Sequence, residues 1–137
     1  MRGIVTLCGS TRFKEQFEEV NRRLTWSGWV VLSVGSFHHS EKDHSVADQI
    51  IKRKVKLDVL HKEKIDLSWA IVVINVGGYM GESTKSELAH ARARGKEVFW
   101  YDISSEDVPT FSDSWTMLLD ESPDDLLAST ISERPDL

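Results

Sequence analysis

The sequence contains little cysteine and no long apolar run. Cys8 is the one cysteine among 137 residues, so the chain cannot form an internal disulfide, and nothing implies an oxidising compartment or a cysteine-based metal cluster. No apolar run approaches the ~18 residues that cross a bilayer, and the N-terminal segment lacks an apolar stretch of secretory-signal length. We therefore expect a cytoplasmic protein that makes no membrane contact and folds by packing alone.

A strong excess of basic residues is also missing. Residues 102–137 hold ten acidic residues and one Arg, whereas the rest of the chain holds sixteen Lys or Arg and twelve acidic residues. This mildly basic part tolerates an anionic ligand, but it lacks the clustered basic stripe with interleaved aromatics that is typical of nucleic-acid binding. We expect no long DNA or RNA partner.

What the sequence does have is a regular alternation of apolar runs and helical periodicities. With 40% hydrophobic and 28% charged residues, residues 1–137 are expected to form one domain. Apolar, β-branched runs predict strands at residues 3–8, 29–34, 70–76 and 97–101. Helical spacing predicts helices at residues 13–24, 46–60 and 83–94. Apolar strands separated by helices predict an α/β fold with a doubly wound parallel sheet of four or five strands.

The pattern weakens in the acidic C-terminal segment, residues 102–137. Residues 115–119 fit either a fifth strand or the start of a helix, and residues 123–130 resemble a short helix. The fold expected for this segment is therefore left open, while the site is sought in the part of the chain before it.

Ligands of such sheets bind at the carboxyl ends of the strands, where three loops should meet. The first is Gly9-Ser10-Thr11-Arg12, which brings a glycine, two hydroxyls and an Arg to a helix N-terminus. Backbone N–H groups and the helix dipole favour an anion such as phosphate there. The alternative is a tight turn in which Ser10 or Thr11 is the N-cap. The other two loops are residues 35–40 and 77–84.

The third loop leads to a candidate catalytic carboxylate. The loop lacks the Gly-Lys-Ser/Thr order of a phosphate loop, so a P-loop NTPase is rejected. Glu87 is expected in the first turn of the next helix, directed back toward the strand ends, where a carboxylate can act as nucleophile or base. Spacing alone favours another interpretation, in which Thr84 and Glu87 form a capping box.

Other polar residues near these loops have simpler interpretations. A metal site is one interpretation of the histidine-rich second loop, but the spacing of its residues matches no established metal-binding pattern. A polar loop that covers a pocket is the simpler interpretation. The residues concerned are His38, His39, Glu41, Asp43 and His44. Residues 52–54 (KRK) and 62–64 (KEK) are expected on the solvated face of one long helix that continues to about Asp66, and one side chain of this face could reach the ligand.

Three segments together resemble the nucleoside 2-deoxyribosyltransferase superfamily. They are residues 8–12 (CGSTR), residues 65–70 (IDLSWA) running into the apolar strand, and residues 81–91 (GESTKSELAHA) followed by Gly95-Lys96. The resemblance covers about residues 3–101 and is greatest to 2'-deoxynucleoside 5'-phosphate N-hydrolases. It implies a flavodoxin-like fold and an N-glycosidase that acts on a nucleoside or nucleoside 5'-monophosphate, by hydrolysis or transfer, without a metal or other cofactor.

The resemblance also implies roles for individual residues. Glu87 takes the place of the nucleophile that attacks the anomeric carbon of the sugar. The superfamily's carboxylate that positions this nucleophile has no unique counterpart; by simple alignment His61 stands at its place, with Asp58 one turn earlier on the same helix face. Residues expected to hold the substrate or its phosphate are Cys8, Gly9, Ser10, Thr11, Arg12, Gly35, Phe37, His38, Gly78, Gly81, Ser83 and Thr84.

The sequence departs from the superfamily pattern at two places, and alternatives stay open. Ser68-Trp69 replaces the usual Ala-Asp before the third strand, and Thr6 stands where some N-hydrolases have a Tyr. A non-catalytic nucleotide-binding module of the same fold is therefore one alternative. A glycohydrolase of a larger nucleotide such as NAD is another. The superfamily implies a homodimer, since its members often complete the site from a neighbouring subunit.

Overall fold

The computed structural model describes residues 2–35, 47–103 and 113–120. Strands and helices alternate along the chain as the sequence predicts. In chain order they are β1 (Gly3–Gly9), α1 (Lys14–Trp26), β2 (Trp29–Leu32), α2 (Ala47–Leu67), β3 (Ala70–Val76), α3 (Glu82–Ala93), β4 (Glu97–Ile103) and the 3-10 helix η1 (Trp115–Leu118).

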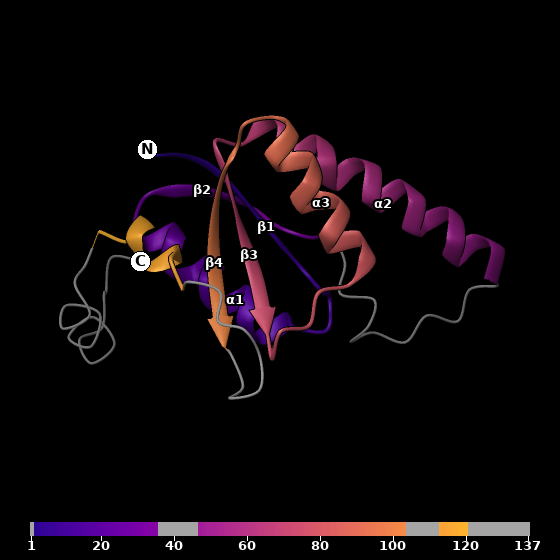
Figure 1. Ribbon diagram of the computed structural model, residues 1–137, viewed down its shortest axis with the longest axis horizontal. Helices are drawn as coiled ribbons and strands as arrows, with labels where there is room; N and C mark the ends of the chain where they lie inside the picture. Colours follow the sequence, from indigo (N-terminus) through magenta and orange to yellow (C-terminus); the bar gives the residue numbers. More distant parts are fainter. Residues whose placement is uncertain (1, 36–46, 104–112, 121–137) are drawn as a thin grey trace.

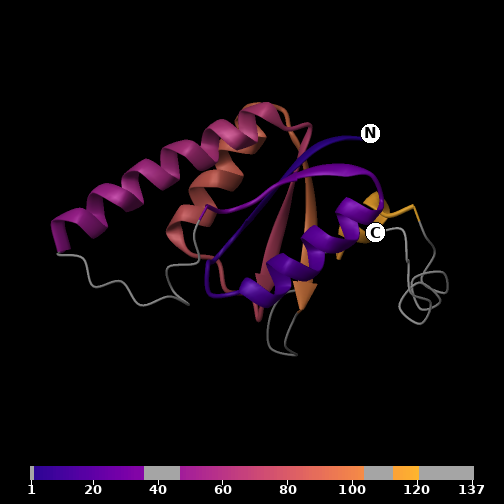
Figure 2. The ribbon, with the colours of Figure 1, turned by 180° about the vertical axis from the view of Figure 1, so that it is seen from behind.

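The strands of the described residues form one parallel sheet in the order β2-β1-β3-β4. Helix α1 and the short helix η1 cover one face, and helices α2 and α3 cover the other (Figures 1 and 2). This arrangement confirms the predicted doubly wound α/β sheet, with four strands in the described residues. Since all strands are parallel, the loops that follow β1, β2 and β3 lie at the same edge of the sheet.

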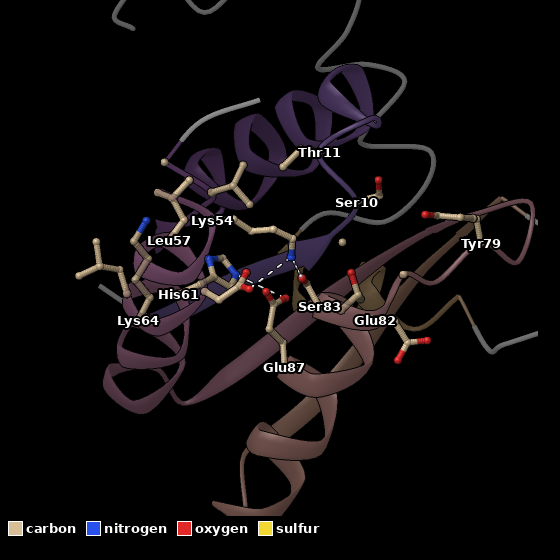
Figure 3. Close-up of a pocket in the computed structure, with 17 residues that line it drawn as sticks. Ser10, Thr11, Lys54, Leu57, His61, Lys64, Tyr79, Glu82, Ser83 and Glu87 are labelled. Atoms are coloured by element: carbon tan, nitrogen blue, oxygen red, sulfur yellow. Dashed lines mark hydrogen bonds and ion pairs between the residues drawn. The ribbon is translucent and has the colours of Figure 1, made fainter. Parts of the chain in front are cut away.

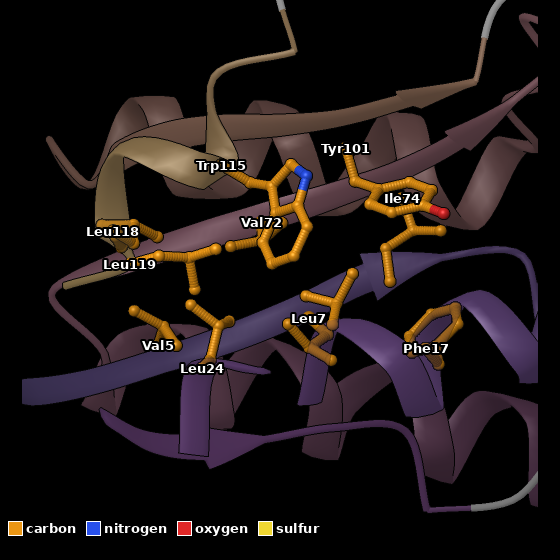
Figure 4. Close-up of a cluster of buried hydrophobic side chains, with 12 residues drawn as sticks. Val5, Leu7, Phe17, Leu24, Val72, Ile74, Tyr101, Trp115, Leu118 and Leu119 are labelled. Atoms are coloured by element: carbon orange, nitrogen blue, oxygen red, sulfur yellow. The ribbon is translucent and has the colours of Figure 1, made fainter. Parts of the chain in front are cut away.

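Each face of the sheet is sealed by its own apolar cluster. On the α1 face, Phe17 and Leu24 pack against β1 and β3 together with residues of η1 (Figure 4). On the other face, Ile65 of α2 and Leu88 of α3 pack against Ile71 and Val73 of β3. Strand β3 lies between β1 and β4 and is buried on both faces, which explains its continuous apolar sequence.

The C-terminal pattern resolves into a 3-10 helix rather than a fifth strand. Trp115 and Leu118, three residues apart, lie on one side of a 3-10 helix, so both side chains bury against the α1-face cluster. The ring of Trp115 lies 5.6 Å from the ring of Tyr101 in β4. The expected helix at residues 123–130 falls outside the described residues.

Helix α2 has 21 residues, and its end agrees with the long helix expected to continue to about Asp66. It ends only at Leu67, just before β3, and one end extends past the sheet (Figure 1). Its polar residues continue along the whole length. In the described part of the chain, no helix combines the length and the apolar character needed to cross a membrane.

Candidate active site

A cavity of about 360 Å³ opens at the carboxyl edge of the sheet, between α2 and α3 (Figure 3). This volume is in the range of small-molecule binding sites. The loops after β1, β2 and β3 contribute part of the wall, and one face of each of the two helices contributes the rest. The lining residues are Gly9, Ser10, Thr11, Val34, Gly35, Lys54, Leu57, Asp58, Leu60, His61, Lys64, Tyr79, Gly81, Glu82, Ser83, Thr84 and Glu87.

The loop after β1 is a tight turn that depends on glycine. Gly9 has a φ of 153°, and a Cβ at this position would lie 2.8 Å from the backbone oxygen of Ile74. The Ser10 hydroxyl accepts a hydrogen bond from the backbone N–H of Arg12 at 3.3 Å. Helix α1 begins only at Lys14, with Phe13 as N-cap, so the alternative that Ser10 or Thr11 caps this helix is wrong.

Helix α3 begins earlier than expected, and this changes the place of Glu87. The N-cap is Gly81 in an extended conformation, and no side chain caps the helix. Glu87 is therefore the sixth helical residue, in the second turn rather than the first. Because Thr84 and Glu87 both lie inside the helix, the capping-box interpretation is wrong.

Glu87 is instead a buried carboxyl group at the wall of the cavity, with 8% of its surface exposed. Burial raises its pKa to about 7, and the negative charge of Asp58 adds to this increase. A hydrogen bond from the Cys8 thiol and the charges of Lys62 and Lys54 act in the opposite direction. Near neutral pH this carboxyl group is thus poised between its protonated and ionised forms.

Two further buried groups surround the Glu87 carboxylate. The Nε2 atom of His61 lies 3.9 Å from Oε2 of Glu87 (Figure 3) and 3.6 Å from Sγ of Cys8. Burial lowers the pKa of His61 to about 4, aided by Lys64, so the imidazole is neutral at neutral pH. Burial raises the pKa of the Cys8 thiol, which keeps it protonated.

A cation links the two helices across the cavity. The Nζ atom of Lys54 donates hydrogen bonds to Ser83 Oγ at 2.9 Å and to Asp58 Oδ2 at 3.4 Å (Figure 3). Lys54 belongs to the basic run in which one side chain was expected to reach the ligand site, and it lines the cavity. It therefore supplies positive charge beside the Ser83 hydroxyl, and the Ser10 hydroxyl lines the same cavity.

Most of the predicted site residues meet at this cavity, but three do not line it. Cys8 lies behind His61 and Glu87, fully buried. Arg12 is exposed, and its guanidinium lies over the Tyr79 ring at 4.7 Å from the ring centre. Gly78 is also absent from the lining. Two predicted substrate-binding residues of the second loop, Phe37 and His38, fall outside the described residues. The same is true of the other residues considered for a metal site there.

Sequence reasoning missed several lining residues, and for α2 a signal was present. Leu57 and Leu60 recur with Lys54, His61 and Lys64 at steps of three and four, which places them on one helix face. Tyr79 lies in the loop after β3, and its hydroxyl would be 3.4 Å from a Cβ at Gly81. Val34 and Glu82 complete the missed set.

Comparison with known proteins bears on the fold. No protein-family model matches the sequence, and no curated protein matches it significantly. The solved 2-deoxyribosyltransferase from the psychrotolerant bacterium Bacillus psychrosaccharolyticus superposes with a TM-score of 0.61, covering 90% of this chain and 95% of that one. The chain has the fold of a 2-deoxyribosyltransferase. With 16% sequence identity the similarity is one of fold, and it agrees with the resemblance seen in the sequence motifs.

Proposed function

We propose that the protein is an N-glycosidase that cleaves the base–sugar bond of a nucleoside 5'-monophosphate or nucleoside, with Glu87 as the nucleophile. The observation that carries the proposal is a buried carboxyl group, with its pKa raised to about 7, in the wall of a cavity of ligand size. Strongly shifted carboxyl groups in such cavities are typical of catalytic residues. The fold shared with a solved 2-deoxyribosyltransferase supports the proposal, since the loops that line this cavity follow parallel strands.

The chemistry fits an ionised carboxylate. An oxygen of Glu87 attacks the anomeric carbon as the bond from that carbon to the base nitrogen breaks, and the bonding electron pair leaves with the base, which takes up a proton. The developing oxocarbenium charge is stabilised by the carboxylate. Water then displaces Glu87 from the glycosyl ester in hydrolysis, and a second base does so in transfer.

His61 and Asp58 act on Glu87 rather than on the substrate in this proposal. The neutral imidazole of His61 lies beside Oε2 of Glu87 and restricts where the carboxylate points. The charge of Asp58 raises the pKa of Glu87 and so its basicity. Both are positioning residues on the face of α2 that lines the cavity.

Lys54 is the cation that we assign to the 5' phosphate. Its Nζ atom lies against the Ser83 hydroxyl, and with the Ser10 hydroxyl in the same lining it offers donors to an anion. Arg12, which the sequence motif suggested for this role, is replaced in the proposal because it does not line the cavity and its guanidinium lies over the Tyr79 ring.

The experiment is a substrate panel. The purified full chain is incubated with nucleosides and their 5'-monophosphates, with and without a second free base, and released base is measured by liquid chromatography. The proposal predicts base release, faster from a monophosphate than from its nucleoside. Product that contains the second base would identify transfer. Binding of monophosphates without any base release would contradict the proposal and leave a nucleotide-binding module.

A further inference from the structure

Three side chains of metal-ligating type meet at the inner wall of the cavity. They come from three separate elements: Cys8 from the end of β1, His61 from α2 and Glu87 from α3. Their ligand atoms Sγ, Nε2 and a carboxylate oxygen all lie within 4.8 Å of one another. All three residues are buried, with exposed fractions of 0%, 5% and 8% in that order. Such a convergence of a thiol, an imidazole and a carboxyl group is more than the glycosidase chemistry requires.

The distances are close to those of a tetrahedral zinc site. Zinc bonds of about 2.0–2.3 Å at tetrahedral angles place neighbouring ligand atoms roughly 3.3–3.6 Å apart. The separation of Cys8 Sγ from His61 Nε2 is 3.6 Å, and that of His61 Nε2 from Glu87 Oε2 is 3.9 Å. A cation between the three atoms therefore needs only a small movement of the Glu87 side chain.

We propose that Cys8, His61 and Glu87 bind one zinc-class divalent cation, and that the bound cation withdraws Glu87 from its role as nucleophile. A thiol and an imidazole favour Zn²⁺ and similar borderline ions over Mg²⁺ or Ca²⁺, which prefer oxygen ligands. The thiolate and the carboxylate carry two negative charges, which balance the charge of the ion. Binding releases the thiol proton, and any proton on Glu87, to solvent.

The surroundings support a three-ligand site with an open position. His61 is also hydrogen-bonded to the backbone of Leu7, which fixes the ring with Nε2 toward the other two ligand atoms. Cys8 lies behind the cavity wall, whereas His61 and Glu87 line the cavity. The fourth position of the ion therefore faces the cavity, where water or a ligand atom can reach it.

The test of metal binding does not require catalytic activity. The full chain, purified under reducing conditions and freed of metal with a chelator, is titrated with Zn²⁺ and separately with Co²⁺. We expect one tightly bound ion per chain and a thiolate-to-cobalt charge-transfer band in the near ultraviolet. Because the band is read on the wild-type chain, no variant has to fold for it. A Co²⁺ complex without this band would overturn the proposal.

Variants then assign the ligands. Cys8→Ser and His61→Gln should each weaken zinc binding on the order of a hundredfold or more, since loss of an outer hydrogen-bond partner already costs 10–100-fold. The matched control is His90→Gln in α3, where the imidazole pairs with Asp66 at 2.8 Å instead. A chain with His38, His39 and His44 all changed to Gln should also keep the site. Zinc affinity that falls only in this triple variant would overturn the proposal.

The effect on catalysis rests on the proposed function, and its failure is distinguishable from failure of the metal site. One equivalent of Zn²⁺ should stop base release by the wild-type chain, and a chelator should restore it. Zinc that binds through Cys8 and His61 yet leaves base release unchanged would overturn the proposal that the bound ion withdraws Glu87. A chain that is inactive when free of metal, yet shows the thiolate-to-cobalt band once Co²⁺ is added, would contradict the proposed function alone.

Discussion

Replacing Glu87 by Gln should make the protein more stable at alkaline pH. The pKa of Glu87 rises from 4.5 to about 7 on folding, so the native state binds its proton more tightly than the unfolded chain does. The contribution of Glu87 to stability therefore falls as pH rises from 4.5 to 7, and the full penalty is present above 7. A shift of about 2.5 pKa units corresponds to roughly 3 kcal/mol, at about 1.4 kcal/mol per unit.

Glu87→Gln removes the charge while keeping the shape of the side chain. The new amide must find a partner near Cys8 and His61, and an imperfect hydrogen bond costs about 1 kcal/mol. We therefore expect a net gain of about 2 kcal/mol in the free energy of unfolding at pH 8, which turns into a loss of about 1 kcal/mol below pH 4.5, where only the imperfect hydrogen bond remains. A catalytic residue that destabilises its own fold is a common compromise between activity and stability.

The assay is urea unfolding of the wild-type chain and the variant at pH 5 and pH 8, in chelator so that no metal binds. Glu63→Gln is the control, because Glu63 is exposed on α2 and does not line the cavity. This control should change the free energy of unfolding equally little at both pH values. A Glu87→Gln variant less stable than the wild type at pH 8, or a gain that is the same at both pH values, would refute the reasoning.

Three further predictions follow from the same geometry. The value of kcat/KM for base release should rise with pH through about 7 as Glu87 ionises, measured as initial rates from pH 5 to 9, and a flat profile would contradict this role. Lys54→Ala should weaken monophosphate binding by roughly 1.5–3 kcal/mol in calorimetric titration and leave nucleosides little changed, whereas Arg12→Ala should have the smaller effect. An equal loss for both ligand classes would place Lys54 outside the phosphate site. Light scattering should give a dimer of the 15.6 kDa chain, and a fully active monomer at micromolar concentration would rule out a shared site.

The order of the elements was predictable because elements that are buried need apolar residues at characteristic spacings. The central strand β3 is apolar at nearly every position, and its predicted bounds, Ala70 to Val76, are those observed. Strand β2 is covered less completely and ends two residues earlier than predicted, at Leu32. For the Trp115 segment, two apolar residues three apart fit several local structures, and its contacts with distant residues such as Tyr101 leave no local pattern.

The site was predictable in part, because topology brings loops together but does not fix side chains. The first and third loops and Glu87 do meet at one edge of the sheet. The exact start of α3 was not predictable, since Gly81 gives no side-chain capping signal and a Thr-to-Glu spacing suggests a false one. The approach of Cys8 to His61 joins residues 53 positions apart, so no local pattern reports it.

The most direct test of the account is base release by Glu87→Gln under single-turnover conditions, at pH 8 and free of metal, with the best substrate from the panel. A variant without its nucleophile should be slower on the order of 10⁴-fold or more, as for nucleophile loss in other covalent enzymes, while Glu63→Gln keeps the wild-type rate. A Glu87→Gln chain that releases base within about tenfold of the wild-type rate would contradict Glu87 as the nucleophile.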